Sequence, residues 1–430
     1  MADPADIAHL LRRTEFIAKP NRVAALSALT LDQAVDDILN ISATPVALPQ
    51  YLTYNAEDDG YNQWVYAVKW WCDRMVDSPK PMQEKMAFFW HSHFCTSWDK
   101  VQRTEAMMNQ NKLFRDSCLG NFRQLTHAMA LQPAMLLYLD NVDNVVGEPN
   151  QNFARELMEL FTLGVGNYSE DDVSAAAAAW TGYGVNWDNY TYQFRAGEHD
   201  DTDKLFFGVT KKWTGPLIID EILAINLTKK LIACKYLTKR LWESFAYQNP
   251  EDAVVNELAQ VLYDNDMAIK PWVRAMLLRP EFYSVTAKQG LIMPPVDWLV
   301  SIMYRVNERS EEVNPQWRLD GMGQVPFVPP NVSGWRPNMY WVNATVLASR
   351  ADFARSMTWK LRQNNANDIS KMTTDDAINT VSNLFGLTLS APSRAAMTSY
   401  LTAQRAKEKS WYESTNLLTM AMLTPECHMA

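Results

Sequence analysis

The sequence predicts a mainly α-helical protein, either a multi-helix bundle or an array of helical pairs, with one small β-hairpin insert. Apolar residues recur at spacings of three and four along most of the chain, which is typical of amphipathic helices. Capping side chains precede several of these stretches. One region, 182–208, instead alternates aromatic residues at Tyr190, Tyr192 and Phe194, and this period of two predicts strand. Strand is therefore expected mainly around 182–208.

Two capping boxes predict helix starts in the first half of the chain. Thr30 is followed three residues later by Gln33, and Ser169 is followed by Asp172. In this arrangement each side chain accepts a hydrogen bond from the backbone N–H of the other residue. Two donors that have no partner within the helix are thereby satisfied. The second box precedes the alanine run 175–179 and predicts a helix there.

The second half of the chain shows the same helical pattern. Apolar side chains at spacings of three and four predict a helix over 231–245. Asn249 and Pro250 are interpreted as the N-cap and first residue of the next helix. Proline has no backbone N–H, and at the first position of a helix that N–H would have no partner within the helix. Two further helices are predicted over Thr374–Phe385 and 392–406.

The segment 321–343 cannot be a continuous helix because it is interrupted by prolines. It also carries Trp335 and Trp341, whose large apolar rings are unfavourable in water. We therefore expect an ordered loop packed against the body of the protein. Its prolines are Pro326, Pro329, Pro330 and Pro337.

The chain is expected to form one unit over 1–430, with two helical lobes as a finer division. In that division 1–181 is an N-terminal helical lobe and 182–216 is the extended insert. The C-terminal helical lobe spans 217–430 and contains the loop 321–343.

Composition argues against several classes of protein. The 430 residues include 49 acidic and 40 basic side chains, a net charge of −9, so no nucleic-acid partner is expected. No apolar run reaches the roughly 18 residues of a membrane span, and the first residues do not resemble a signal peptide. The sequence as it stands predicts a cytoplasmic protein, or a periplasmic or extracellular one if an export signal was removed. Five cysteines without a C-x-x-C pair favour buried, reduced thiols.

Two histidines lie two residues apart in the aromatic sequence 89–94. His91 and His93 point in different directions on a helix, so they could share a ligand only where the helix ends. Glu84 lies seven residues before His91, on the same helix face. The alternative interpretation is that each imidazole is buried and hydrogen-bonded to a carbonyl or carboxylate.

A polar stripe follows Pro149. Asn152, Glu156 and Glu159 are spaced by four and three residues, which places the two carboxylates about 5–6 Å apart at Cβ. Such a pair suits a hard cation, or an acid and a base whose pKa values are driven apart. The alternative is an exposed helix face partnered by Arg155 and nearby lysines.

A third polar group lies inside the non-helical insert. His199 and Asp200 are adjacent there, and loops carried by a rigid scaffold often hold sites. A turn rich in acidic residues explains the same pattern.

On these residues the chain resembles the domain of unknown function 1800 family. The resemblance runs from His9-Leu10-Leu11-Arg12-Arg13 through 89–94, the long motif 150–164 and 199–208 to 323–343. It implies no activity. Many members have glutamate where this chain has Gln151, and histidine where it has Phe161, so a site that needs either residue would be altered here.

Three functional interpretations remain. The first is a hydrolase acting on envelope or extracellular material, either metal-dependent or using acid and base groups. The second is a glycan-active helical toroid with Glu156 and Glu159 as its carboxylate pair, and the third is a scaffold or assembly protein whose motifs are buried polar networks. Partners would be glycans or proteins.

The hydrolase hypothesis names specific residues. Its catalytic side chains would be Glu156, Glu159, His199 and Asp200. A divalent ion, with zinc, iron or manganese favoured by imidazole ligands, would be held in one shared pocket by His91, His93, Glu156 and His199. The expected ligand-binding side chains are Asn150, Asn152, Arg155, Trp335 and Trp341.

Overall fold

The structure is a computed structural model of the 430-residue chain, and it describes all residues except 42–45, 50–59, 289, 365–368 and 408–409. Helices make up 66% of it, so the predicted mainly α fold is confirmed. The strands form two small antiparallel hairpins rather than one, and the second ends slightly beyond the predicted insert. The strands are β1 (Tyr183–Asn186), β2 (Thr191–Phe194), β3 (Lys204–Phe206) and β4 (Val209–Lys211).

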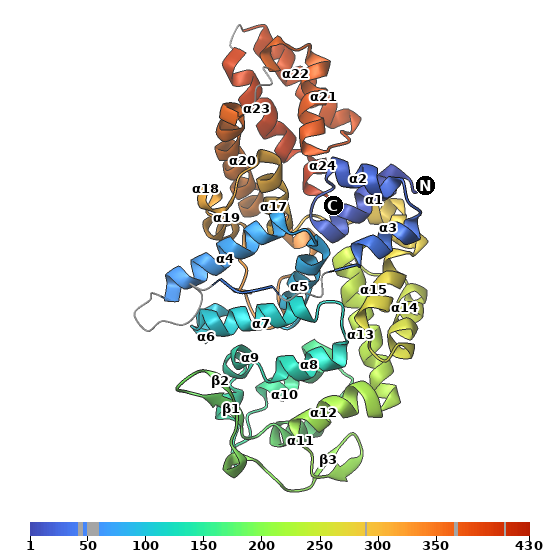
Figure 1. Cartoon of the computed structure of the whole chain (residues 1–430), viewed down its shortest axis with the longest axis vertical. Helices are drawn as coiled ribbons and strands as arrows, with labels where there is room; N and C mark the ends of the chain where they lie inside the picture. Colours follow the sequence, from blue (N-terminus) through green and yellow to red (C-terminus); the bar gives the residue numbers. More distant parts are fainter. Residues whose placement is uncertain (42–45, 50–59, 289, 365–368, 408–409) are drawn as a thin grey trace.

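Three N-terminal helices pack on one another and on a later part of the chain (Figure 1). They are α1 (Pro4–Glu15), α2 (Pro20–Ser27) and α3 (Leu31–Ile38). The predicted box at Thr30 and Gln33 is present at the start of α3. Helix α3 also contacts α15 (Ile269–Leu277), so parts of the two predicted lobes pack against each other.

The centre of the molecule is formed by helices that surround α5 (Pro81–His93) (Figure 1). Nearly every residue of α5 is buried, because α1, α4 and α7 pack around it. A helix enclosed on several sides is apolar around most of its circumference, and the aromatic sequence 88–94 meets that need. The other helices of this region are α4 (Gly60–Asp77), α6 (Trp98–Val101), α7 (Thr104–Asp116), α8 (Phe122–Ala130) and α9 (Pro133–Tyr138).

The polar motif 150–164 forms a short helix that widens into a π-helix. The predicted box at Ser169 and Asp172 then starts the next helix, which packs against β3. The two hairpins project at one end of the molecule (Figure 1). The elements are η2 (Asn141–Asp143), α10 (Asn152–Glu156), the π-helix η3 (Leu157–Thr162), α11 (Glu170–Ala179) and η4 (Ala196–Glu198).

The next region begins with α12 (Gly215–Asp220), which packs on α8 across the insert. The helix predicted over 231–245 is present as the C-terminal part of α13 (Leu227–Phe245). The predicted start at Asn249 is wrong. Asn249 has a left-handed backbone with φ 56°, and the following helix begins two residues after Pro250, with Glu251 at its N-cap. The remaining elements are η5 (Glu221–Ile225), α14 (Asp252–Asp264), η6 (Pro280–Tyr283) and α16 (Val285–Lys288).

The C-terminal helices gather at the opposite end from the hairpins (Figure 1). Between them, the segment 323–337 contains no helix, and Trp335 and Trp341 are 8% and 1% exposed. The prediction of an ordered loop packed on the body is therefore confirmed. The elements are α17 (Pro295–Val306), α18 (Ser310–Val313), α19 (Pro315–Met322), η7 (Asn338–Trp341), α20 (Ala344–Asn364), η8 (Ile369–Lys371), α21 (Thr374–Phe385), α22 (Ala391–Arg405), α23 (Ser410–Leu423) and α24 (Pro425–His428).

Two further sequence-based expectations can be compared with the structure. All five cysteines are buried and free, as predicted. Among the described helices, none combines the length and the apolar character needed to cross a bilayer.

Candidate ligand-binding cavity

One face of α5 forms the base of a cavity. Lys85, Phe88, Phe89 and Ser92 line it, and their spacing of three, four and seven residues places them on one side of the helix. The opposite face of α5 is buried against other helices. The sequence therefore presents two aromatic rings, an amine and a hydroxyl to the same space.

Two other helices supply charge to this cavity. Arg12 and Arg13 lie in the last turn of α1, where a cation is favoured by the helix dipole. Arg240 and Glu243 are one turn apart near the end of α13. The cavity thus lies between segments that are more than two hundred residues apart in the chain.

The loop after α19 closes the cavity on another side. Gly334 has φ +81°, and a Cβ placed there would lie 2.6 Å from the Ser92 carbonyl oxygen, so only glycine allows this close approach to α5. The next residue, Trp335, stacks on Phe88 with ring centroids 5.9 Å apart and an interplanar angle of 16°. Gln324 holds the start of the loop by accepting a hydrogen bond from the Val296 N–H at 2.9 Å.

His91 fixes the same loop from below. The Phe327 backbone N–H donates to His91 Nε2 at 3.0 Å, and the Phe327 carbonyl accepts from the Trp98 N–H at 2.8 Å. The imidazole is enclosed by the rings of Trp71, Phe327 and Trp335. Burial lowers the pKa of His91 to about 3, which keeps Nε2 unprotonated and able to accept. His91 is therefore a positioning residue for the wall of the cavity.

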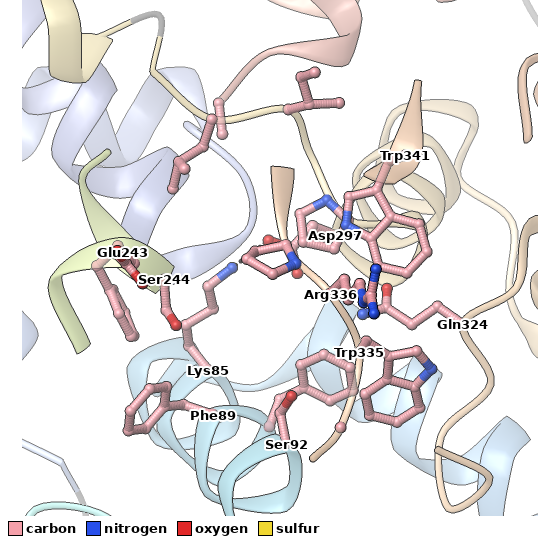
Figure 2. A pocket seen from close by; sticks show the side chains of 18 of the residues that line it. Lys85, Phe89, Ser92, Glu243, Ser244, Asp297, Gln324, Trp335, Arg336 and Trp341 are labelled. Carbon is pink, nitrogen blue, oxygen red and sulfur yellow. Dashed lines mark hydrogen bonds and ion pairs between the residues drawn. The ribbon is translucent and has the colours of Figure 1, made fainter. Parts of the chain in front are cut away.

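The cavity has a volume of about 290 Å³ (Figure 2). Figure 2 shows Glu243 and Ser244 on one side and Trp335, Trp341 and Gln324 on the other. Five basic side chains line it against two acidic ones, an excess of three positive charges. The basic residues are Arg12, Arg13, Lys85, Arg240 and Arg336, and the acidic ones are Glu243 and Asp297.

Two of the cations are held by groups of the protein. Lys85 forms an ion pair with the buried Asp297. Arg13 donates from Nη2 to the carbonyl oxygens of Ala246 at 3.3 Å and Ala287 at 2.5 Å. Carbonyl groups orient a guanidinium without neutralising it, so Arg13 keeps its charge in the cavity wall.

The other three cations have no ion pair. Within the described part of the chain, no carboxylate lies in ion-pair contact with Arg12, Arg240 or Arg336. Arg240 instead donates a hydrogen bond to the Tyr236 hydroxyl at 3.1 Å. Burial, followed by the charge of Arg305, lowers the pKa of Arg12 to about 10. Burial and the neighbouring Arg12 likewise lower the pKa of Arg13 to about 9. The cavity therefore contains positive charge that the protein does not neutralise.

The predicted pair of motif histidines does not converge. His91 accepts from Phe327, whereas His93 Nε2–H donates to the Phe161 carbonyl at 3.0 Å. Burial, followed by the charge of Arg240, lowers the pKa of His93 well below its ordinary value. His93 follows the alternative interpretation, a buried imidazole that donates to a carbonyl. His91 is buried as well, but it accepts from a backbone N–H, which that interpretation did not include. Glu84 is separated from them as well, because Trp71, Arg74 and Arg115 bind its carboxylate.

Glu156 and Glu159 lie near each other, as the helical spacing predicts. Burial and the charge of Glu159 raise the pKa of the half-buried Glu156. Glu159 accepts a hydrogen bond from the Tyr168 hydroxyl. Arg155 does not pair with either carboxylate; it binds Glu170 through both guanidinium nitrogens, at 2.8 and 2.7 Å.

The remaining predicted residues bind partners close to them in the sequence. Asn150 accepts from the Asn152 N–H, and Asn152 donates to Asp140 at 3.3 Å. His199 Nδ1–H donates to the Thr181 carbonyl at 2.9 Å. Asp200 accepts from the backbone and hydroxyl of Thr202 and pairs with Lys204 at 3.5 Å.

The shared metal pocket finds no support in this geometry. His91, His93 and His199 bind separate backbone groups, and none of them or Glu156 lines the cavity. Across the residues that the structure describes, no group of three or more His, Cys, Asp and Glu side chains is arranged to hold a metal ion. Of the expected binding residues, Trp335 and Trp341 line the cavity and the others do not.

Comparison with known proteins adds a family but no activity. Residues 9–429 match the family described as protein of unknown function (DUF1800). The chain belongs to this family. Neither the curated proteins nor the solved structures contain a match. Membership of DUF1800 thus confirms the resemblance seen in the sequence motifs. Because the family has no assigned activity, the chemistry of the cavity is inferred from the residues that line it.

Sequence reasoning missed most of the cavity. Lys85 and Asp297 form an ion pair although they are 212 residues apart in the sequence. Arg240 lies on a helix whose sequence pattern is that of an ordinary amphipathic core helix. One signal was present: Arg12 belongs to the motif near the start of the chain. The sequence does not reveal which helix faces which.

Proposed function

We propose that this chain binds a small organic anion in the cavity between α1, α5, α13 and the segment 333–341. The excess of three positive charges in the cavity lining carries this proposal. The chain as a whole has nine more acidic than basic side chains. In a chain of net negative charge, a cluster of arginines without carboxylate partners around one cavity is not expected by chance. An anionic ligand would neutralise them.

The rest of the lining supports an organic body on that anion. Phe88, Phe89, Trp335 and Trp341 give the cavity aromatic walls. Its volume of about 290 Å³ is at the low end of the roughly 300–1,000 Å³ typical of small-molecule sites. A metabolite-sized ligand fits this space better than a neutral glycan chain, for which the excess of positive charge would have no counterpart.

Calorimetry with two probes of similar size tests the proposal. Benzoate is expected to bind and benzyl alcohol is not, because only the first carries a charge. Arg240→Gln should weaken benzoate binding about tenfold, as expected for losing one charge-assisted hydrogen bond. Arg355→Gln, at an exposed arginine on α20 that does not line the cavity, is the control and should change nothing. Equal binding of both probes would contradict the proposal.

A second candidate is the acid and base hydrolysis suggested by the carboxylate pair. The observation that favours it is the asymmetry of the two groups: Glu156 has a raised pKa, and Glu159 accepts from Tyr168. Two neighbouring carboxyl groups in different environments can act as acid and base at one pH. His199 and Asp200 bind local partners of their own, so in such an enzyme they would not act together with the carboxylate pair.

This candidate is tested with chromogenic p-nitrophenyl esters and glycosides. Hydrolysis that is lost in Glu156→Gln and Glu159→Gln, but retained in the exposed variant Glu170→Gln, would support it. Hydrolysis that survives both substitutions would remove the pair from consideration. A purely structural role for the motifs, the scaffold hypothesis, would leave the unsubstituted protein and all three variants without activity.

A further inference from the structure

The charge balance of the cavity points to more than a generic anion. Resting on the proposed binding function, we propose that the bound group is a dianionic oxyanion of the phosphate monoester type, held by Arg12, Arg240 and Arg336. These three guanidinium groups come from three separate elements, α1, α13 and the loop after α19. Each of them can donate up to five N–H hydrogen bonds.

The number of uncompensated charges selects the ligand charge. The side chains that line the cavity have an excess of three positive charges, and the buried carboxylate of Asp297 already pairs with Lys85. A monoanion would leave two of the three charges without compensation in a partly desolvated space. A dianion would leave only one of them without compensation.

The chemistry of the donors selects an oxyanion with several oxygens. Guanidinium groups bind carboxylate and phosphate oxygens in planar, bidentate geometry. A carboxylate offers two oxygens, whereas a phosphate monoester offers three and carries about −1.5 to −2 charges at neutral pH. Three guanidiniums supplied by three separate elements have more donors than a carboxylate can accept, so a tetrahedral group with three oxygens satisfies them better. Burial, followed by the charge of Arg305, lowers the pKa of Arg12, as expected for a guanidinium without a carboxylate partner.

The aromatic wall distinguishes an ester from free phosphate. Trp335 and Phe88 are stacked on each other, and Trp341 is almost fully buried beside the cavity. These rings offer apolar contact that inorganic phosphate cannot use. An organic group of modest size attached to the phosphate would occupy that part of the cavity.

Isothermal titration with isosteric probes tests this inference. Phenyl phosphate and phenyl sulfate have nearly the same shape but carry two and one negative charges at pH 8. We expect phenyl phosphate to bind at least about tenfold tighter. Arg240→Gln and Arg336→Gln should weaken phenyl phosphate more than phenyl sulfate. Arg355→Gln should change the affinity for neither probe. A circular dichroism spectrum of each variant checks that it is folded.

The outcomes separate the two proposals. Equal affinities for phenyl phosphate and phenyl sulfate, with both weakened by Arg240→Gln, would overturn the dianion and leave the binding function standing. Absence of binding by phenyl phosphate, phenyl sulfate and benzoate would overturn both. Inorganic phosphate binding as tightly as phenyl phosphate would overturn the monoester, because the aromatic wall would then contribute nothing to binding. Should Arg12→Gln fail to fold, the other two variants decide the question.

Discussion

At the scale of single residues, the motif histidines serve the fold more directly than chemistry. His91 offers its unprotonated Nε2 to the Phe327 N–H, and His93 donates to the Phe161 carbonyl. A buried backbone N–H without an acceptor is unfavourable by about 1–3 kcal/mol, so a neutral imidazole in this position stabilises the loop it holds. This role explains why an aromatic helix contains histidine without requiring a metal.

We expect His91→Ala to destabilise the protein by about 2–4 kcal/mol, through the loss of the acceptor and the cavity left by the ring. His127→Ala is the matched control. His127 is partly exposed and pairs with Asp220 at 2.9 Å, and such surface pairs contribute at most about 1 kcal/mol. Urea unfolding measures both. Similar losses in the two variants would show that His91 does not anchor the loop.

At the scale of elements, the contact between α5 and the loop 333–341 forms the cavity wall. The loop approaches so closely that the Gly334 position lacks room for a Cβ beside the Ser92 carbonyl. Trp335 then covers Phe88, and η7 places Trp341 on the same side. The preceding part of the segment, 323–337, contains no helix, yet it is anchored by the hydrogen bond from Phe327 to His91 and by the burial of the Trp335 indole ring.

Substitution of Gly334 by alanine should lift this loop from α5. Two effects combine: a left-handed backbone at φ +81°, which is unfavourable by about 1 kcal/mol for alanine, and a contact at 2.6 Å that requires movement. Gly147→Ala isolates the first effect, because Gly147 has φ +88° and nothing within 4 Å of its Cβ position. We expect Gly334→Ala to cost about 1–3 kcal/mol more than Gly147→Ala in urea unfolding.

Limited proteolysis of the same two variants provides the structural readout. Cleavage between 323 and 343 should appear in Gly334→Ala and not in Gly147→Ala. Equal resistance to the protease, together with equal unfolding free energies, would mean that the loop tolerates a side chain at this position.

At the scale of the whole molecule, the pKa values of four histidines are lowered, of which His9, His91 and His93 are buried and His428 is partly buried. Burial lowers the pKa of His9 to about 2, of His91 to about 3 and of His428 to about 4, and that of His93 falls well below its ordinary value. In the unfolded chain the same groups titrate near 6.5. Below that pH the unfolded state binds protons that the folded state does not, so folding stability falls with falling pH.

The free energy of unfolding should therefore decrease as the pH is lowered from 6.5 towards 4. Each of these histidines contributes up to about 1.4 kcal/mol per pH unit in this window. Urea unfolding at pH 7.5, 6.0 and 5.0 measures the slope, and His91→Gln, which keeps an acceptor but cannot titrate, should reduce it by about one proton. A constant unfolding free energy over this range would contradict the burial of these side chains.

The sequence alone determined the features that depend on neighbouring residues. The capping boxes at Thr30 and Ser169 form as predicted, because each joins groups three residues apart. The strand-forming insert was recognised from its two-residue alternation, and the loop 321–343 from its prolines and tryptophans. The local rule failed at Asn249, where the chain turns through a left-handed conformation and the helix starts later.

The site depended on contacts that no local pattern contains. Glu156 and Glu159 were correctly placed as neighbours by helical spacing, but His91, His93 and His199 bind three unrelated backbone groups. Only the tertiary structure brings Arg12 and Arg240 to the same hollow as Lys85 and leaves the two arginines without carboxylates. Helical spacing decides which side chains share a face. Which faces meet, and with what net charge, is decided by the packing of whole helices, and that is why the cavity could not be predicted from the sequence.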